Sequence, residues 1–596
     1  MAVALGVQTV RRISLVKGNT MAATPNAPSV PPLETKPFGN VRFDAIAGFL
    51  VFLIAMPLCL AIARASGFPP IAGIWTAVIG GILTTFLSNA QLTIKGPAAG
   101  LIVIVYGAVT ELGKEFGTEG MSDTDRAFLG YKLALGIGLA AGVIQILFGL
   151  LRAGRLADFF PLTPVHGMLA SIGIIIIAKQ AYEVIGVTPT KGVGPLELIA
   201  EFPGKLRSIN PEIAIIGFVG LMILFGLPFI GKRIKWVKKV PAQLIVLIVA
   251  IGLGTLFQLD HQHTYLFPDS FLDSDHPAVY EVGPRFLVDM PEVLKDPASA
   301  FAFPDFRGLA TATGLQYLLL FTLIGSLESL LSAKAIELLD PWKRKTNFDR
   351  DLLAVGFANT IAAAVGGLPM ISEIVRSKAN IDNGARTKWA NAWHGVFLLG
   401  FVLLFPSLIH RIPLAALGAM LVYTGFRLAS PSEFVRTFKV GSEQFLVFIG
   451  TIIATLATDL LIGISVGIGM KILFHLWHGA PVRGLFSSDV STATEPDGIT
   501  VLVRKSALFT NWLGLRKLIV QAANGHQNVK IDLSQTRLVD HSVMEKLHEL
   551  ENEFAANGKH LQVIGLDDHK PLSNHPLAAR KCRANNSDPH EPANTI

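Results

Sequence analysis

The sequence predicts a polytopic α-helical membrane protein with about fourteen segments in a seven-plus-seven inverted repeat, half-helices at spans 3 and 10, and a small cytosolic α/β domain. Hydrophobic residues form 51% of the 596 residues and charged residues only 16%, against about 25% in soluble domains. Apolar runs of about twenty residues, long enough to cross a bilayer, recur between Phe43 and Trp477. Breaks rich in Gly and Pro recur in both halves. This composition excludes a soluble multidomain enzyme.

Residues 1–41 are polar and rich in Pro and Ala, without an apolar run or a small-residue cleavage site. They predict a disordered cytoplasmic N-terminal arm rather than a cleaved signal peptide. Because Met21 opens the more ordinary part of this arm, the sequence leaves open whether residues 1–20 are translated.

A transmembrane transport domain is predicted over residues 42–480, where Pro, Gly and charged residues separate the apolar runs. We place its segments at 44–64, 69–88, 97–112, 129–151, 163–186, 211–230, 240–258, 309–337, 349–366, 371–384, 389–406, 412–428, 443–459 and 461–478. The third and tenth are too short to cross about 30 Å of hydrocarbon, and each begins at a Gly/Pro break. Both are therefore predicted to be half-helices.

Basic residues concentrate in the connections after even-numbered segments, whereas the long loop after the seventh segment is acidic. The basic positions include Arg152, Arg155, Lys232, Arg233, Lys235, Lys238, Lys239, Lys343, Arg344, Lys345 and Arg350. Because cytoplasmic loops carry the excess of Lys and Arg, both termini are predicted to be cytoplasmic. The same loops account for the net charge of +7, which therefore does not indicate a nucleic-acid partner.

The two breaks also predict the repeat. Pro97 and Pro369 lie 272 positions apart, and Pro57 and Glu328 lie 271 positions apart. An odd number of spans in each half inverts the second half relative to the first, which is typical of secondary transporters with a central site. A channel stays open as an alternative.

The C-terminal part changes character. After a linker at 481–498, residues 499–570 contain strand-like runs such as NVKIDLSQ and helical runs that end at Gly525 and Gly558. This pattern predicts a small α/β domain in the cytosol. Residues 571–596 are polar and are predicted to be a disordered tail.

A helix that begins inside the membrane points unpaired N–H groups and the positive end of its dipole toward the bilayer centre. The tenth segment begins near Ile371, and Arg376 adds a full charge one turn deeper. The third segment offers the N–H groups of Ala98 and Ala99, with Lys95 at its mouth. Two opposed positive ends predict an anion site. Simple kinks, an Arg376 that binds carbonyls and a Lys95 that snorkels to the interface stay open as alternatives.

Glu328 lies in an apolar part of the eighth segment, and Ser332 one turn later shares its helix face. An unpaired carboxylate inside a membrane is costly, so Glu328 is expected to be protonated, paired with a cation such as Arg376, or bound to a metal ion. Each arrangement can couple a cation to transport. A static Glu–Arg pair is the structural alternative.

The sequence supports neither an enzyme nor a cofactor. No nucleophile elbow, phosphate-binding glycine loop or pair of catalytic carboxylates stands out. His261, His263 and His276 lie near Asp residues at irregular spacing, which favours a solvated loop over a metal site, and no metal is expected.

Several stretches resemble the SulP (sulfate permease) family. Residues 356–387, GFANTIAAAVGGLPMISEIVRSKANIDNGART, resemble its span-nine-to-ten signature. AGFLVFLIAMPLCLAIA resembles its first span, IKGPAAG its third, SLESLLSAK its eighth, and residues 499–566 its C-terminal STAS domain. The resemblance covers roughly 40–570. It implies core and gate domains, elevator-like transport and a homodimer.

By resemblance, the anion site includes the residues that follow Pro369, namely Met370, Ile371 and Ser372, and Glu328 and Ser332 occupy the coupling-ion position. The chain departs from the family at Ala98 and Val375, where Ser or Thr is frequent, and at Glu373, where a small residue is frequent. A Glu rather than an Asp at position 328 favours H⁺ slightly over Na⁺ as the coupling cation.

The resemblance also singles out Asp540, His541 and Ser542 in the STAS region. Stand-alone relatives carry Asp followed directly by a phosphorylated Ser, whereas here His541 follows Asp540 and Ser542 is displaced. This pattern favours a dimerising or partner-binding role, including a cytosolic partner, over a phosphoswitch.

Together these observations predict a multi-pass protein of the cell (inner) membrane that moves a small inorganic anion, sulfate or bicarbonate, by cation-coupled secondary active transport. An anion channel, or a membrane-anchored STAS regulator with vestigial transport, stays open as an alternative. Substrate, stoichiometry and direction are not predicted.

Overall fold

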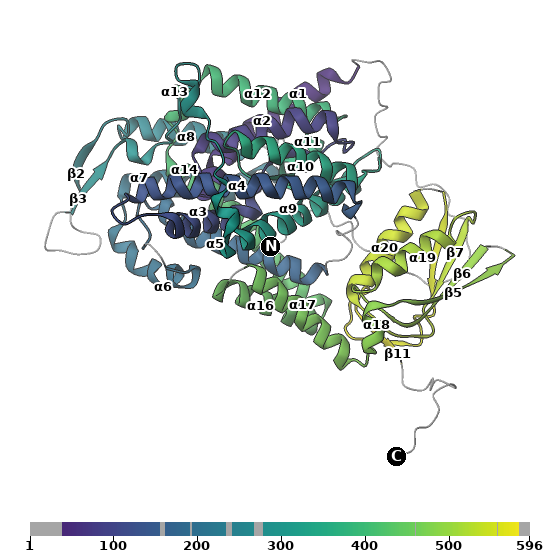
Figure 1. Ribbon diagram of the computed structural model, residues 1–596. Helices are drawn as coiled ribbons and strands as arrows, with labels where there is room; N and C mark the ends of the chain where they lie inside the picture. The colour runs from purple at the N-terminus through teal and green to yellow at the C-terminus, as the bar shows by residue number, and fades with distance from the viewer. Residues whose placement is uncertain are drawn as a thin grey trace.

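The computed structural model describes residues 39–154, 161–190, 193–233, 241–267, 278–458, 460–496, 498–556 and 558–582. Figure 1 shows a large bundle of helices with a smaller α/β domain beside it. Most of the expected N-terminal arm and the expected tail after Cys582 lie outside the described residues.

Each of the expected membrane segments contains a helix. Those of the first half are α1 (Val41–Ala65), α2 (Pro70–Leu87), α3 (Ile102–Phe116), α4 (Asp123–Leu150), α5 (Leu162–Val184), α7 (Pro211–Arg233) and α8 (Ala242–Leu256). Those of the second half are α9 (Ala312–Leu339), α10 (Phe348–Ala364), α11 (Ile374–Asp382), α12 (Trp389–Leu404), α14 (Leu414–Leu428), α16 (Ser442–Ala457) and α17 (Leu460–Trp477). Shorter helices that the sequence did not predict are α6 (Pro195–Lys205), α13 (Pro406–His410), α15 (Pro431–Val440) and α18 (Val482–Phe486).

Length and composition agree with a membrane setting. In the part of the chain that the structure describes, seven helical stretches are long and apolar enough to cross a bilayer, namely those of α1, α2, α4, α5, α7 and α9 and the continuous stretch Leu414–Val440. Helices α8, α12, α16 and most of α17 are apolar but shorter. The predicted polytopic helical fold is thus confirmed.

Small residues allow the helices around the two breaks to approach closely. A Cβ added at Gly73 of α2 would lie 2.0 Å from the carbonyl oxygen of Cys59 in α1. One added at Gly356 of α10 would lie 2.6 Å from the backbone nitrogen of Ile146 in α4. Because α2 also packs on α10 and α12, helices from the two halves of the chain surround the breaks together.

The two breaks form short strands before the half-helices begin. Strand β1 (Ile94–Pro97) pairs antiparallel with β4 (Met370–Glu373). The tenth segment is therefore helical from Ile374, and the predicted helix start near Ile371 was wrong. A 3-10 turn at Ala99–Leu101 likewise precedes α3. Strands of four residues are too short for a period to reveal them, and each pairs with a segment from the other half.

The acidic loop after α8 contains a hairpin of β2 (His263–Phe267) and β3 (Ala278–Val282). His263 therefore lies in a strand rather than in an irregular loop. His276 lies outside the described residues.

The C-terminal domain is built on one sheet with the strand order β10-β11-β8-β6-β7-β9, and β5 pairs with β6. Its strands are β5 (Asp489–Glu495), β6 (Gly498–Ala507), β7 (Asn528–Asp532), β8 (Thr536–Val539), β9 (His560–Ile564), β10 (His569–Pro571) and β11 (Arg580–Cys582). Helices α19 (Trp512–Ala522) and α20 (His541–Ala556) pack their apolar faces on the sheet, around buried side chains such as Val501 and Leu547.

The boundaries of this domain are wider than predicted. Residues 481–498, expected to be a linker, contain α18 and β5, and residues 571–582, expected to belong to the tail, include β11. Both strands lack an apolar signal because β5 is a polar edge strand and β11 has three residues. Pairing with β6 and β8 decides their structure.

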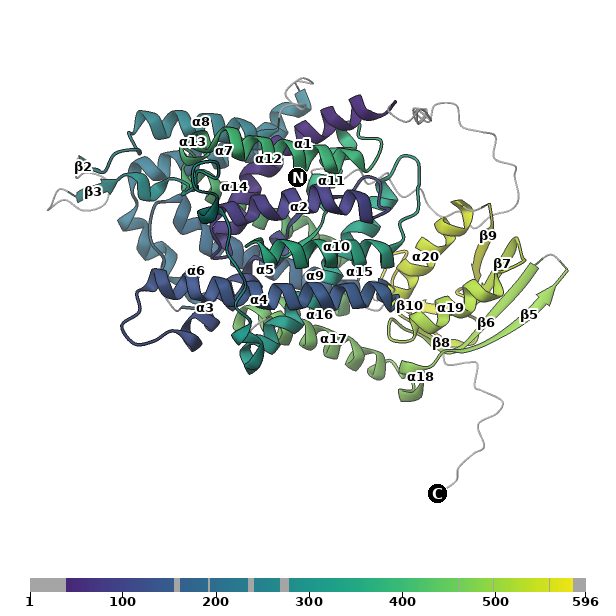
Figure 2. The same ribbon diagram turned by 45° about the horizontal axis from the view of Figure 1, so that its top comes forward.

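Both views of the ribbon place the C-terminal domain at one end of the helical bundle, next to α17 (Figures 1 and 2). The β5–β6 hairpin points away from the bundle in both views.

Candidate functional site

The two half-helices begin side by side because the strands before them pair. In the β1–β4 ladder Lys95 lies opposite Ser372 and Pro97 lies opposite Met370. Beyond the ladder, the N–H of Ala98 donates to the carbonyl of Pro369 at 3.3 Å. The residues that the sequence selected at the two breaks are thus brought together, although the Ala98 amide already has an acceptor.

Side chains from the surrounding helices satisfy the backbone groups of this small sheet. Asn359 of α10 accepts from the N–H of Met370 at 2.7 Å and donates to its carbonyl at 3.2 Å. The other such acceptors are Ser377 for Ile94 at 2.8 Å, Ser329 for Ser372 at 3.1 Å and Asn391 for Lys95 at 3.1 Å. These bonds pair edge groups of a two-stranded sheet within the membrane, where an unpaired backbone group is costly.

The Lys95 ammonium pairs with Asp351 of α10. Its Nζ lies 2.7 Å from Oδ1 and 2.8 Å from Oδ2 of Asp351, and it also donates to the hydroxyl of Ser372. Ser88 donates to the same carboxylate at 2.5 Å. In this structure the charge of Lys95 is paired with a carboxylate, and its direct contact with an anion stays a prediction.

Arg376 lies in the first turn of α11, and its side chain is only 1% exposed. Its Nη1 donates to the Sγ of Cys59 at 3.4 Å. Nε and Nη2 are buried and have no hydrogen-bond partner among the described residues. Because an uncompensated buried charge is costly, a guanidinium with two unused donors at a helix N-terminus can bind an anion.

Gly96 leaves the room in which this guanidinium lies. A Cβ added at Gly96 would fall 2.2 Å from Nη1 of Arg376. The glycine of the first break therefore determines where the arginine of the second break can be.

Two carboxylates lie at the start of the other half-helix. The N–H of Gly100 donates to the Glu328 carboxylate, and the N–H of Ala99 donates to the Glu373 carboxylate. A Cβ added at Gly100 would lie 2.3 Å from Oε1 of Glu328. The Ala99 amide, which the sequence selected for the anion, is thus occupied by an acidic side chain of the protein itself.

Ser332 lies buried one turn after Glu328 in α9, as expected, but a different serine of this helix reaches the break. Ser329 accepts from the N–H of Ser372, and its own hydroxyl lies 3.3 Å from that of Ser372. The part that Ser332 plays with a coupling ion stays a prediction.

The polar residues around the breaks that the sequence reasoning missed include Ser329, Asp351, Asn359 and Asn391. Each lies in an apolar helix, and a polar side chain in such a setting is a signal for a buried function. Their partners could not be identified because they lie on other segments of the chain.

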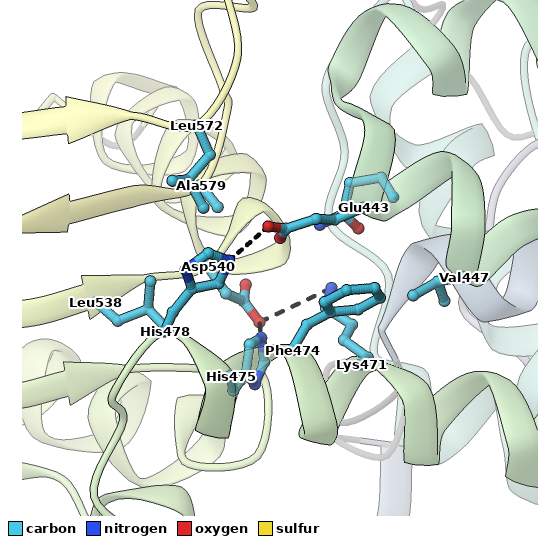
Figure 3. A pocket seen from close by; sticks show the side chains of 11 residues that line it. Glu443, Val447, Lys471, Phe474, His475, His478, Leu538, Asp540, Leu572 and Ala579 are labelled. Atoms are coloured by element: carbon cyan, nitrogen blue, oxygen red, sulfur yellow. Dashed lines mark hydrogen bonds and ion pairs between the residues drawn. The ribbon is translucent and has the colours of Figure 1, made fainter.

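A second polar cluster joins the membrane helices to the C-terminal domain. Asp540 precedes α20, and its Oδ2 lies 3.3 Å from Nε2 of His475 and 3.8 Å from Nζ of Lys471, both in α17. Figure 3 shows these side chains converging from the two sides of the interface. The pocket there is lined by Glu443, Gln444, Val447, Lys471, Phe474, His475, His478, Leu538, Asp540, Leu572 and Ala579.

The Asp540 carboxylate is fully buried and carries its charge. Burial by itself would raise its pKa, but Lys471 and His475 hold the pKa of Asp540 well below its usual range. The same carboxylate accepts from the N–H groups of Val543 at 2.7 Å and Phe509 at 3.1 Å. Asp540 is therefore both the cap of α20 and the counter-charge for α17.

The neighbours of Asp540 are also buried at this interface. Ser542 is 0% exposed, and its Oγ accepts from Nζ of Lys471 at 2.5 Å. A ring nitrogen of His541 lies 2.6 Å from the carbonyl of Leu577. Further along α20, Glu549 pairs with Lys334 of α9 at 2.7 Å. A regulatory role of Asp540, His541 and Ser542 stays a prediction, although Ser542 is closed to solvent in this structure.

Comparison with known proteins identifies the setting of these sites. The Sulfate permease family matches residues 41–451. The chain is 24% identical over 529 residues to the putative sulfate transporter YvdB of Bacillus subtilis (strain 168). This match covers 88% of this chain and 91% of YvdB. It is 25% identical over 462 residues to the bicarbonate transporter BicA of Picosynechococcus sp., a match that covers 77% of this chain and 74% of BicA.

Among solved structures, that of SLC26A9 has the same fold, with a TM-score of 0.63 at 13% identity over 89% of this chain and 85% of the other. The C-terminal sheet fits the STAS domain that the sequence resembles. The matched residues run from α1 into α16 and contain both Gly/Pro breaks, the paired strands and Arg376. The chain therefore belongs to the sulfate permease family, whose members are transporters and not enzymes.

Proposed function

We propose that this protein is a secondary active transporter of a small inorganic anion, sulfate or bicarbonate, with Arg376 as the cationic centre of its site. The observation that carries the proposal is the buried Arg376 guanidinium, whose Nε and Nη2 have no partner in the described residues. The named relatives, a putative sulfate transporter and a bicarbonate transporter, support this substrate class.

In this proposal the anion lies against Arg376 and the residues Met370, Ile371 and Ser372 that precede α11. Ala98 and Ala99 form the opposite wall at the start of the other half-helix. Lys95 acts as a positioning residue through its ion pair with Asp351. A guanidinium and the N–H groups at a helix start bind an anion through charge-assisted hydrogen bonds.

Glu328 and Ser332 form the proposed coupling site, and H⁺ is slightly favoured over Na⁺ as the coupling cation. The carboxylate of Glu328 lies against the Gly100 amide, and its Oε2 is buried without a partner in the described part of the chain. A carboxylate that contacts the half-helix of the anion site can transmit its protonation state to that site.

The setting of the transporter follows the same reasoning. We place it as a homodimer in the cell (inner) membrane, with both termini cytoplasmic because the basic loops follow even-numbered segments. We further propose that a core domain moves against a gate domain in an elevator-like manner during transport. The STAS domain is proposed to bind a cytosolic partner.

Uptake into proteoliposomes tests this function. We expect the wild-type protein to accumulate labelled sulfate or bicarbonate under an imposed pH gradient, with a smaller response to a sodium gradient. Arg376→Ala is expected to abolish uptake, whereas Arg427→Ala, which removes an exposed guanidinium at the end of α14, is expected to retain it. No flux of either anion above empty vesicles would overturn the proposal.

A further inference from the structure

Glu373 is a buried carboxylate at the centre of the anion site. It is the last residue of β4, directly before α11, and its side chain is 8% exposed. The carboxylate accepts from the N–H of Ala99, and its Oε1 has no hydrogen-bond partner within the described ranges. An acidic side chain therefore occupies an amide at the start of the half-helix, where an inorganic anion would otherwise bind.

The groups around Glu373 and its neighbour Arg376 come from four helices. Arg376 of α11 attracts it, and Glu328 of α9 repels it. The thiol of Cys59 in α1 lies near both Arg376 and Glu373, and the buried imidazole of His394 in α12 faces Arg376.

The nearby ammonium of Lys95 in β1 does not supply the missing positive charge, because it is paired with Asp351. Two carboxylates thus lie near each other, and Arg376 lies beside one of them, Glu373. If both carboxylates stayed ionised, an incoming anion would add a third negative charge to a buried site, which is strongly unfavourable.

We propose that Glu373 is a tethered anion that holds the empty site, and that the substrate anion binds by displacing its carboxylate while that carboxylate takes up a proton. The proposal deepens the proposed function and rests on it. Before binding, Glu373 partly neutralises Arg376 and caps the Ala99 amide. When the substrate takes over these contacts, the displaced carboxylate has lost the Ala99 N–H and the attraction of Arg376 in a buried setting, where the neutral acid is the favoured form.

The proton comes from the water that delivers the substrate anion, and it is carried on Glu373 in addition to any proton on Glu328. One guanidinium then faces one anion and a neutral acid. Binding of the anion is therefore coupled to proton uptake at the binding site itself.

The test counts protons in a binding experiment rather than in transport. Purified protein in detergent is titrated with sulfate, and separately with bicarbonate, by calorimetry in buffers of different ionisation enthalpy. We expect the Glu373→Gln variant to take up about one proton fewer per bound anion than wild type, and its affinity to change less steeply with pH. Glu115→Gln, which alters an exposed carboxyl on the other half-helix, serves as the matched control and is expected to behave as wild type.

Two further variants separate the roles. Glu373→Asp keeps a carboxyl group at this position and is expected to keep the proton uptake. This variant provides a second measurement if Glu373→Gln folds poorly. Glu328→Gln is expected to leave the proton on Glu373 in place. Proton uptake that is equal in wild type and Glu373→Gln would overturn the inference while leaving the anion site intact. If wild type binds neither anion, the proposed function fails and the inference fails with it.

Discussion

The ammonium of Lys95 lies 2.7 Å from Oδ1 of Asp351, and both side chains are 1% exposed. This pair connects β1 to α10. Strand β4 is connected to the same carboxylate, because the hydroxyl of Ser372 donates to Asp351 at 3.2 Å. A single buried ion pair thus holds both broken segments and a helix in one arrangement.

Removing one member of this pair leaves an uncompensated buried charge. We expect Lys95→Met or Asp351→Leu to lower the unfolding free energy by about 3–5 kcal/mol and to lower the Tm in detergent. The double variant Lys95→Met with Asp351→Leu should recover much of this loss. Lys378→Ala is the control, because its pair with Asp382 is exposed and contributes about 1 kcal/mol or less. A single variant as stable as the control would show that the pair has no structural role.

Gly96→Ala tests the contact between the two breaks. The added Cβ would fall 2.2 Å from Nη1 of Arg376, so the guanidinium must move. We expect the apparent KM for anion uptake in proteoliposomes to rise at least about tenfold, which corresponds to about 1.4 kcal/mol. Gly252→Ala in α8 meets no atom within 4 Å and should leave uptake unchanged. Normal uptake by Gly96→Ala would mean that the position of Arg376 does not govern binding.

Asn359→Ala removes the side chain that bonds both backbone groups of Met370. Because these groups would then be buried without partners, we expect a loss of about 1–3 kcal/mol and a lower Tm. Asn552→Ala is the control, since Asn552 is exposed on α20 and its side chain donates to the His548 carbonyl of its own helix. Equal thermal stability of the two variants would contradict the role assigned to Asn359.

Asp540→Asn keeps a capping side chain before α20 but removes the counter-charge of Lys471. Since the pKa of Asp540 is lowered in the folded protein, its stabilising contribution is present above the unfolded pKa of about 4 and is lost only as the pH falls through the lower folded value. The destabilisation, about 3–5 kcal/mol, should therefore be the same at pH 7 and pH 8.5 in thermal unfolding.

Asp489→Asn provides the matched control for the interface. Asp489 pairs with Lys505 at 3.2 Å on the exposed part of the C-terminal domain. We expect a change of about 1 kcal/mol or less. An effect of Asp540→Asn no larger than that of Asp489→Asn at pH 7 would contradict a charged Asp540 at this interface.

Hydropathy predicted the membrane helices well because each one must satisfy its own backbone and present apolar side chains to lipid. The Gly/Pro breaks at Pro97 and Pro369 likewise marked the half-helices, and the run around Arg376 marked the proposed anion site. The strands β1 and β4 were missed because each is four residues long and forms a strand by pairing with the other, which lies in the other half of the chain.

The sequence by itself determined a two-part membrane transporter, its broken segments and the charged residues that lie at them, because these follow from local composition and spacing. Only the tertiary structure decided the partners: Lys95 with Asp351, Asn359 with Met370, Glu373 with the Ala99 amide and Asp540 with α17. A buried polar group must find a partner, but the backbone that brings the partner comes from a distant segment, and hydropathy carries no information about which segment that is.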